Sequence, residues 1–159
     1  MLIGVLSDTH GQIYATLKAI RMLESCRVGT VIHCGDIGSP AIVSLFQQWP
    51  THFVFGNVDD PRSLEAAIRE AGQTSHQRFG SLEAEGKQIA FMHSDDQNLF
   101  RQTVRSGGWD VVCHGHTHLA EISTAGRTLV LNPGAIDRTE HPSVAVLELP
   151  SLAATPISL

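Results

Sequence analysis

Side chains of the types that bind divalent metal ions occur in five short clusters along this 159-residue chain. The seven candidates are Asp8 and His10, Asp36, Asn57, His93, and His116 with His118. Two carboxylates, one amide oxygen and four imidazoles exceed the needs of one tetrahedral zinc ion and suit two divalent ions that share a carboxylate. Because the set holds no thiolate, it favours manganese, iron, zinc, cobalt or nickel over a thiophilic cluster.

The spacing within the clusters supports a shared site. The pairs Asp8-x-His10 and His116-x-His118 have a period of two, so each pair can present both side chains on one side of an extended segment. Each cluster alone has an ordinary structural explanation, such as a turn residue after a glycine or a satisfied histidine at a strand end. Their occurrence together, in order and at strand ends, is what indicates a metal site.

The elements that must position these clusters alternate between strand and helix in the first half of the chain. Short apolar runs predict strands at Leu2–Leu6, Thr30–Cys34 and His52–Phe55. Helical spacing of apolar residues and cap signals predict helices at Ile13–Cys26, from Ser39 to about Trp49, and from Asp60 to Gly72. This order is typical of parallel strands with helical crossovers. Each candidate cluster lies at the carboxyl end of a predicted strand, in this half of the chain or in the next, at the edge where open α/β sheets bind ligands.

The second half of the chain is richer in strands. Strands are predicted at Phe79–Ala84, Gln88–His93, Trp109–Cys113, Ala120–Thr124, Thr128–Leu131 and Ser143–Leu149, with one helix at Asp96–Arg105. The tail after Glu148 carries no charged side chain and is expected to form an edge strand or a self-contact. The residues alone therefore indicate one α/β domain, 1–159, with one mixed sheet or two sheets packed face to face.

Composition excludes several classes of protein. Hydrophobic residues make up 42% and charged residues 17%, so the chain can bury enough apolar surface to fold. The net charge of −5 does not favour duplex nucleic acid or an anionic membrane as a partner. No apolar run approaches the roughly 18 residues that span a bilayer, and the first residues lack the basic flank of a signal peptide. The three cysteines are widely spaced, which argues against a disulfide framework. We therefore expect a soluble cytoplasmic protein.

The remaining five of the nine histidines are expected to be structural. His33 lies inside a predicted strand and His52 opens another, where packing is the expected role. His76 and His141 fall in segments that look exposed. His114 precedes the Gly-His-Thr-His run, and we expect it not to bind metal.

The ordered motifs resemble those of the calcineurin-like metallophosphoesterase superfamily. They are Asp8-x-His10, Gly35-Asp36, Gly56-Asn57, His93 and Gly115-His116-Thr117-His118. The small size and the run Asn132-Pro133-Gly134-Ala135 resemble the small bacterial and archaeal phosphodiesterase branch of that superfamily. The resemblance covers residues 2 to about 149. It implies a four-layer αββα sandwich of two mixed β-sheets flanked by helices, with two metal ions at the carboxyl ends of the strands.

The resemblance also implies a role for each candidate residue. The first metal ion would be held by Asp8, His10 and His118. The second would be held by Asn57, His93 and His116, with Asp36 bridging both ions. Among these residues we expect His10, Asp36 and Asn57 to be catalytic. The expected cofactors are two divalent ions per chain, with Mn²⁺ first and iron, zinc, nickel or cobalt as alternatives.

Three positions depart from the pattern of the superfamily. Val58 stands where its larger phosphatases have a histidine, which shifts the expected substrate from monoesters to diesters. Ser94 follows His93 where a glycine is usual, although serine can cap the helix that follows. Arg138 only loosely matches the arginine that often follows the Asn-Pro-Gly motif.

The leading hypothesis is a metal-dependent phosphodiesterase in which a hydroxide bridging two metal ions attacks phosphorus in line. The alternatives are a phosphomonoesterase or nucleotide phosphatase with the same di-metal site, and a non-catalytic binding scaffold of the same fold. A scaffold is expected to have lost metal ligands, whereas all seven are present here. The expected partner is a small phosphoester substrate, without membrane or duplex nucleic acid, and a homo-oligomer remains open.

Overall fold

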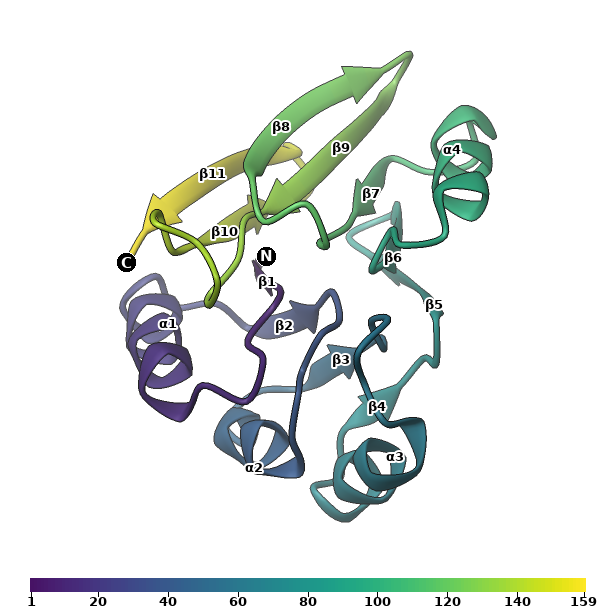
Figure 1. Ribbon diagram of the computed structural model, residues 1–159. Helices are drawn as coiled ribbons and strands as arrows, with labels where there is room; N and C mark the ends of the chain where they lie inside the picture. Colours follow the sequence, from purple (N-terminus) through teal and green to yellow (C-terminus); the bar gives the residue numbers. More distant parts are fainter.

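Two mixed β-sheets pack face to face in the computed structural model, which describes residues 1–159 (Figure 1). The first sheet has the order β11 (Ala153–Ser158), β10 (Ser143–Glu148), β1 (Leu2–Leu6), β2 (Thr30–His33), β3 (Thr51–Phe53) and β4 (Thr74–Ser75). The second has the order β5 (Phe79–Ala84), β6 (Lys87–Met92), β7 (Val111–Cys113), β9 (Thr128–Pro133) and β8 (Ala120–Ala125). Strands β1 to β4 run parallel, as do β6, β7 and β9, while the other strands pair antiparallel at the margins.

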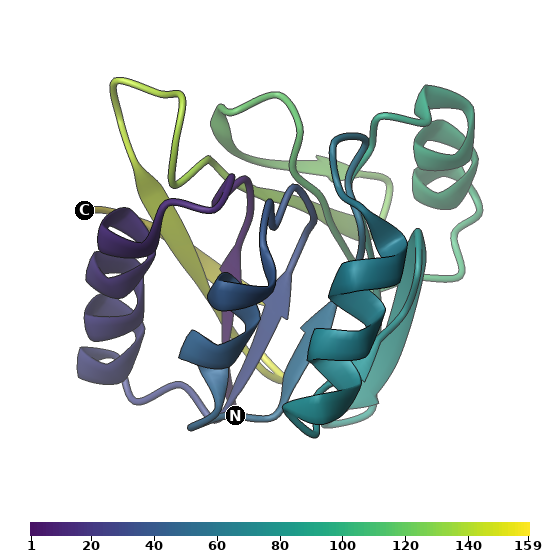
Figure 2. The ribbon, with the colours of Figure 1, turned by 60° about the horizontal axis from the view of Figure 1, so that its bottom comes forward.

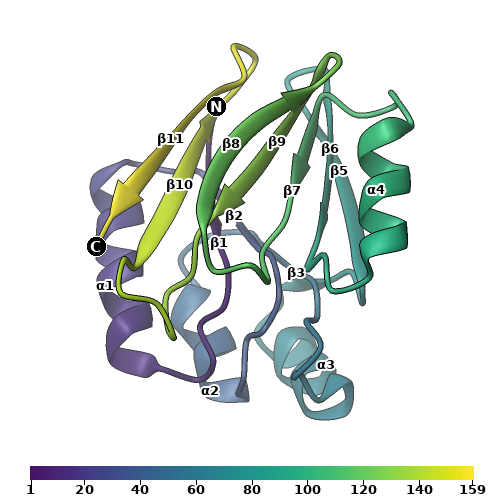
Figure 3. The same ribbon diagram turned by 45° about the horizontal axis from the view of Figure 1, so that its top comes forward.

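Helices cover the outer faces of both sheets. Helices α1 (Ile13–Ser25), α2 (Pro40–Val43) and α3 (Pro61–Glu70) pack on the first sheet, and α4 (Gln97–Arg105) packs on the second. Figure 3 shows α1 and α4 at opposite sides of the molecule. The resulting order of helix, sheet, sheet and helix confirms the predicted αββα sandwich. None of the helices combines the length and the apolar character needed to cross a membrane.

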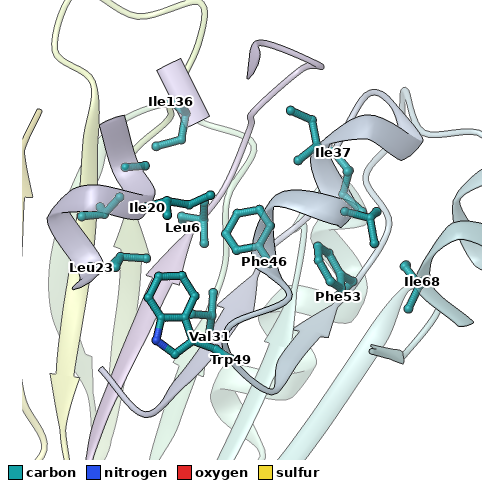
Figure 4. Packing of buried hydrophobic residues seen from close by; sticks show 14 of the residues in the cluster. Leu6, Ile20, Leu23, Val31, Ile37, Phe46, Trp49, Phe53, Ile68 and Ile136 are labelled. Carbon is teal, nitrogen blue, oxygen red and sulfur yellow. The ribbon is translucent and has the colours of Figure 1, made fainter. Parts of the chain in front are cut away.

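Alternate residues of β1 enter different layers of the core. Ile3 and Val5 belong to a cluster of 13 buried residues between the two sheets. Leu6 instead joins 17 buried residues between the first sheet and its helices, where Phe46 meets Phe53 edge to face (Figure 4). Because side chains alternate across a strand, β1 contributes to both of these layers, and the first sheet is buried on both faces around it.

The second predicted helix is much shorter than expected. It was predicted from Ser39 to about Trp49, but α2 ends at Val43 and a 3₁₀ turn, η1 (Ser44–Phe46), follows it. The Ser44 hydroxyl donates to the Ala41 carbonyl oxygen, a local bond that competes with regular helix geometry. The tighter turn also lets both Phe46 and Trp49 enter the core within a short connection.

Most other helix and strand boundaries agree with the prediction within two residues. For the tail after Glu148, the structure decides between an edge strand and a self-contact. The tail forms β11, an edge strand that pairs with β10 along its whole length. The short β4 was not predicted. It pairs with β3 through only two residue pairs, so it is too short to show the alternation of apolar and polar residues that predicts a strand. Figure 2 shows the loops that follow β1, β2 and β3 gathered at one edge of the molecule, at the top of the view.

Candidate metal centre

The loops at this edge bring five of the candidate side chains into two overlapping groups. Asp8, His10 and His118 have ligand atoms within 4.8 Å of one another, and so do Asp8, Asp36 and His93. The Nε2 atom of His118 lies 3.1 Å from Oδ1 of Asp8, and Nε2 of His93 lies 3.3 Å from Oδ2 of Asp36. Nε2 of His10 lies 3.7 Å from Asp8 and 3.8 Å from Asp36, so it faces both carboxylates.

Main-chain contacts determine which ring nitrogens face this cluster. Nδ1 of His93 bonds to the Cys34 carbonyl oxygen at 2.9 Å, and Nδ1 of His118 bonds to the Arg138 carbonyl oxygen at 3.2 Å. A carbonyl oxygen only accepts, so in each ring Nδ1 carries the proton and donates. When such a ring is neutral, its Nε2 lone pair is left beside the carboxylates, which is how metal-binding histidines are usually held.

The cluster contains buried polar atoms that have no hydrogen-bond partner. Oδ1 of Asp8 and Nε2 of His10 are buried and have no hydrogen-bond partner, although Oδ1 lies close to His118. Carboxylate oxygens and imidazole lone pairs at 3.1–4.0 Å repel one another unless a cation lies among them. These residues therefore fit a bound divalent metal ion.

The pKa shifts in the cluster reflect the same demand for positive charge. Burial alone would lower the pKa of His93, but the hydrogen bond to Asp36 and the charges of Asp36 and Asp8 outweigh burial and raise it. Burial alone would raise the pKa of Asp36, yet His93 and the Val58 amide hold it below its usual range. Burial lowers the pKa of His10, so that its ring is neutral and available as a ligand.

The two remaining candidates, His116 and Asn57, lie at the exposed side of the second group. Nδ1 of His116 is 3.3 Å from Nε2 of His93, so this ring adjoins the cluster. The Asn57 side chain is exposed and forms no hydrogen bond with the cluster. Its loop is nevertheless attached there, because the Val58 amide donates to Oδ1 of Asp36 at 3.3 Å.

Strained backbone is concentrated among the candidate ligands. Only 11 residues other than glycine have a positive φ, and five of them are Asp8 at 59°, His10 at 44°, Asp36 at 54°, His116 at 71° and His118 at 61°. The predicted extended conformation of the two period-two pairs is therefore wrong, because tight left-handed turns present these side chains. Strain of about 1–3 kcal/mol per residue persists where surrounding contacts enforce it, and it is commonest at functional sites.

Two glycines allow the loops to approach the carboxylates. A Cβ on Gly56 would lie 1.9 Å from Oδ1 of Asp36, and a Cβ on Gly115 would lie 1.9 Å from the Ser7 hydroxyl and 2.8 Å from Oδ2 of Asp8. All three distances are below contact distance, so no larger residue fits without moving a candidate ligand.

Two polar side chains that were not among the predicted site residues hold the ligand-bearing loops. The carboxylate of Asp59 accepts from the amides of Ile37, Gly38 and Gly56 at 3.1, 2.9 and 2.8 Å, which ties the Asp36 loop to the Asn57 loop. The amide group of Asn132 donates to the Gly115 carbonyl oxygen and to the Thr117 hydroxyl, which fixes the turn between His116 and His118. The Asn-Pro-Gly motif signalled Asn132, whereas nothing local in the sequence signals the long-range contacts of Asp59.

The other singled-out positions have mostly structural roles. His33 is buried and His141 is exposed, as predicted, and His114 is buried as well. The prediction that His76 is exposed is wrong: the residue is half-buried, and its Nε2 lies 2.9 Å from Nδ1 of His52. Ser94 does not cap α4, since Asp96 does so; the Ser94 hydroxyl instead donates to the Gly115 carbonyl oxygen.

An αββα sandwich with a buried cluster of carboxylates and imidazoles at the strand ends indicates the class of metal-dependent hydrolases. The chain belongs to the calcineurin-like phosphoesterase superfamily, whose domain matches residues 1–151. It is therefore a metallophosphoesterase, an enzyme that hydrolyses phosphoester bonds.

Similar proteins come from archaea and bacteria. The chain is 32% identical over 138 residues to a phosphodiesterase of Methanocaldococcus jannaschii, a match that covers 84% of this chain and 83% of that protein. It is 32% identical over 153 residues to a probable metallophosphoesterase of Methanothermobacter thermautotrophicus, covering 94% and 86% of the two chains. A solved structure described as a novel archaeal phosphodiesterase superposes with a TM-score of 0.91 at 30% identity, covering 100% of both chains.

Proposed function

We propose that this metallophosphoesterase hydrolyses phosphodiesters at a centre of two divalent ions, with Mn²⁺ the first candidate. The observation that carries the proposal is the pair of buried polar atoms without hydrogen-bond partners, Oδ1 of Asp8 and Nε2 of His10, within a cluster of carboxylates and imidazoles. The similarity to a protein named as a phosphodiesterase supports the choice of diester substrates.

The two groups in the structure support the assignment of ligands to two ions. Asp8, His10 and His118 would hold the first ion, and they form one of the two groups. Asn57, His93 and His116 would hold the second, with Asp36 between the ions. The position of Asp36 supports a bridging role, because its Oδ2 lies 3.3 Å from His93 of the second set and 3.8 Å from His10 of the first. Asp8 is also near His93, at 4.0 Å, and is the second carboxylate available to both ions.

When bound, two such ions supply an activated water as nucleophile and neutralise charge that develops at the phosphate. The chain itself contributes orientation. The Cys34 and Arg138 carbonyl oxygens direct Nε2 of His93 and His118 inward, and the amides of Val58 and His116 hold one oxygen of each aspartate. Two carboxylates offset only half of the +4 charge of two divalent ions, so this edge would attract a phosphate ester although the whole chain carries −5.

Val58 supports diesters over alkyl monoesters. The residue is 53% exposed, next to Asn57, and its side chain has no proton to give to a leaving group. Lost general-acid assistance is typically worth about 10²–10⁴-fold in rate, so leaving groups that are stable as anions should be strongly preferred. A monoesterase with the same centre would need another proton donor.

The test compares kcat/KM for bis-p-nitrophenyl phosphate and for an alkyl phosphate monoester in the Mn²⁺-loaded protein. We expect the diester to be preferred by at least about 100-fold. Val58→His should raise the relative activity on the monoester, whereas the control Val58→Leu, which adds bulk but no proton, should not. A wild-type chain that hydrolyses both substrates equally well contradicts the proposal. Elemental analysis should find about two ions per chain.

A further inference from the structure

Arg78, which directly precedes β5, links two loops of the candidate metal centre. Its Nη1 donates to the Gly56 carbonyl oxygen at 2.9 Å, and its Nη2 forms an ion pair with the Asp95 carboxylate. Gly56 directly precedes Asn57, and Asp95 lies two residues after His93. The guanidinium therefore spans the loops that carry two of the residues assigned to the second ion.

The contact with Gly56 fixes the peptide that leads into Asn57. The Gly56 carbonyl and the Asn57 amide belong to one planar unit, so a bond to this oxygen restrains the orientation of the Asn57 backbone. The preceding peptide is held as well, because the Gly56 amide donates to Oδ2 of Asp59 at 2.8 Å. Asn57 itself is exposed, so its position depends on its backbone.

The Asp95 end of the link is attached to a more rigid part of the site. His93 is buried, and its ring donates to the Cys34 carbonyl oxygen, so its loop is anchored in the core between the sheets. Arg78 thus transmits the position of the His93 loop to the more exposed Asn57 loop.

We propose that Arg78 is a positioning residue. It holds the Asn57 loop at a fixed position relative to the His93 loop and thereby completes the site of the second metal ion. The inference rests on the proposed two-ion function. Arginine suits this role because its rigid fork reaches two separate acceptors at once, whereas the single ammonium of lysine binds as a point charge. The side chain is 47% exposed, and exposed ion pairs add little to global stability. A role in positioning is therefore separable from a role in folding.

The test is a calorimetric titration of the metal-free protein with Mn²⁺. Wild type should show two binding events. Because loss of a residue that orients a metal ligand typically weakens metal affinity 10–100-fold, Arg78→Ala should weaken one event at least about 10-fold and leave the other within about twofold. Arg78→Lys and Asp95→Asn should give intermediate losses. The matched control is Arg101→Ala, which removes an exposed arginine that bonds only to Asn98 within α4 and should change neither event.

A second readout does not require metal. The Val58 amide is protected by its bond to Asp36, so its hydrogen exchange should be at least about fivefold faster in Arg78→Ala than in wild type, while amides of β1 stay unchanged. Equal weakening of both binding events, or unchanged binding and exchange, would overturn the role of Arg78. A wild-type chain that binds fewer than two ions instead overturns the two-ion proposal, and the exchange rate at Val58 then decides whether Arg78 positions this loop.

Discussion

Replacing Asp8 with asparagine separates metal binding from ordinary packing at the candidate centre. Oδ2 of Asp8 accepts from the His116 amide at 3.2 Å, and asparagine keeps an oxygen for that bond. Asparagine also tolerates the left-handed backbone at φ 59°, so the substitution adds little strain. What it removes is the negative charge that both groups of candidate ligands share.

The expected size of the effect follows from linkage. An ion present at 100 times its Kd stabilises the native state by about 2.7 kcal/mol. In a chain of this length, 1 kcal/mol shifts Tm by roughly 2–4 °C, so each ion should raise Tm by about 5–11 °C. Asp8→Asn should lose most of that rise, because Asp8 contributes to both groups. In EDTA the variant should unfold at the same temperature as wild type or at a higher one. The substitution removes the charge of Asp8, and without metal ions that charge faces the carboxylate of Asp36 unneutralised.

The assay is thermal unfolding followed by circular dichroism, with EDTA or with saturating Mn²⁺. Asp110→Asn is the control, because Asp110 lies away from the cluster and contacts Lys87 and the Gln88 amide. The reasoning would be refuted if Asp8→Asn kept the full Mn²⁺-dependent rise. It would also be refuted if the variant in EDTA lost as much stability as wild type gains from Mn²⁺, since Asp8 would then be a packing residue.

Two further predictions concern the metal-free protein, both measured by urea unfolding. Gly56→Ala should lower the free energy of unfolding by about 1–3 kcal/mol, because its Cβ would collide with Asp36, whereas Gly29→Ala, with its nearest neighbour at 4.0 Å, should change it by less. Burial lowers the pKa of His33 to about 3 and that of His114 to about 4, so below pH 6.5 the unfolded chain binds protons that the folded chain does not. Stability should therefore fall as the pH drops from 6.5 towards 4, by up to about 2.7 kcal/mol per pH unit for the two residues, and a flat profile would contradict their burial as neutral rings.

The gathering of the candidate ligands could be predicted because it depends on local patterns. Short apolar runs mark β1, β2 and β3, and the carboxyl ends of parallel strands meet at one edge. Asp8 and Asp36 follow two of these strands, so their proximity needed no knowledge of loop conformation. The period-two argument for His116 and His118 was wrong, because left-handed turns present the two rings to different groups: His118 lies beside Asp8 and His116 lies beside His93.

The features of the site that the sequence did not predict depend on contacts between residues that are distant in the sequence. Asp59 reaches amides 21 and 22 residues away, and Asn132 reaches a carbonyl 17 residues away. Such bonds form only after the sheets have assembled, and no periodicity announces them. The burial of His76 has the same origin, since its ring packs on Phe91 of the other sheet at a centroid distance of 4.9 Å.

The pairing of β1 has a consequence for synthesis of the chain on the ribosome. β1 emerges first, yet one of its two neighbours is β10, and the amino group of Met1 bonds to the Leu149 carbonyl oxygen at 2.9 Å. Until that late segment emerges, the nascent protein carries an apolar strand with an open edge, which is prone to pair with other chains. Completion of the first sheet, and of the Asp8 loop that extends from it, is therefore a late event that requires nearly the full length of the chain.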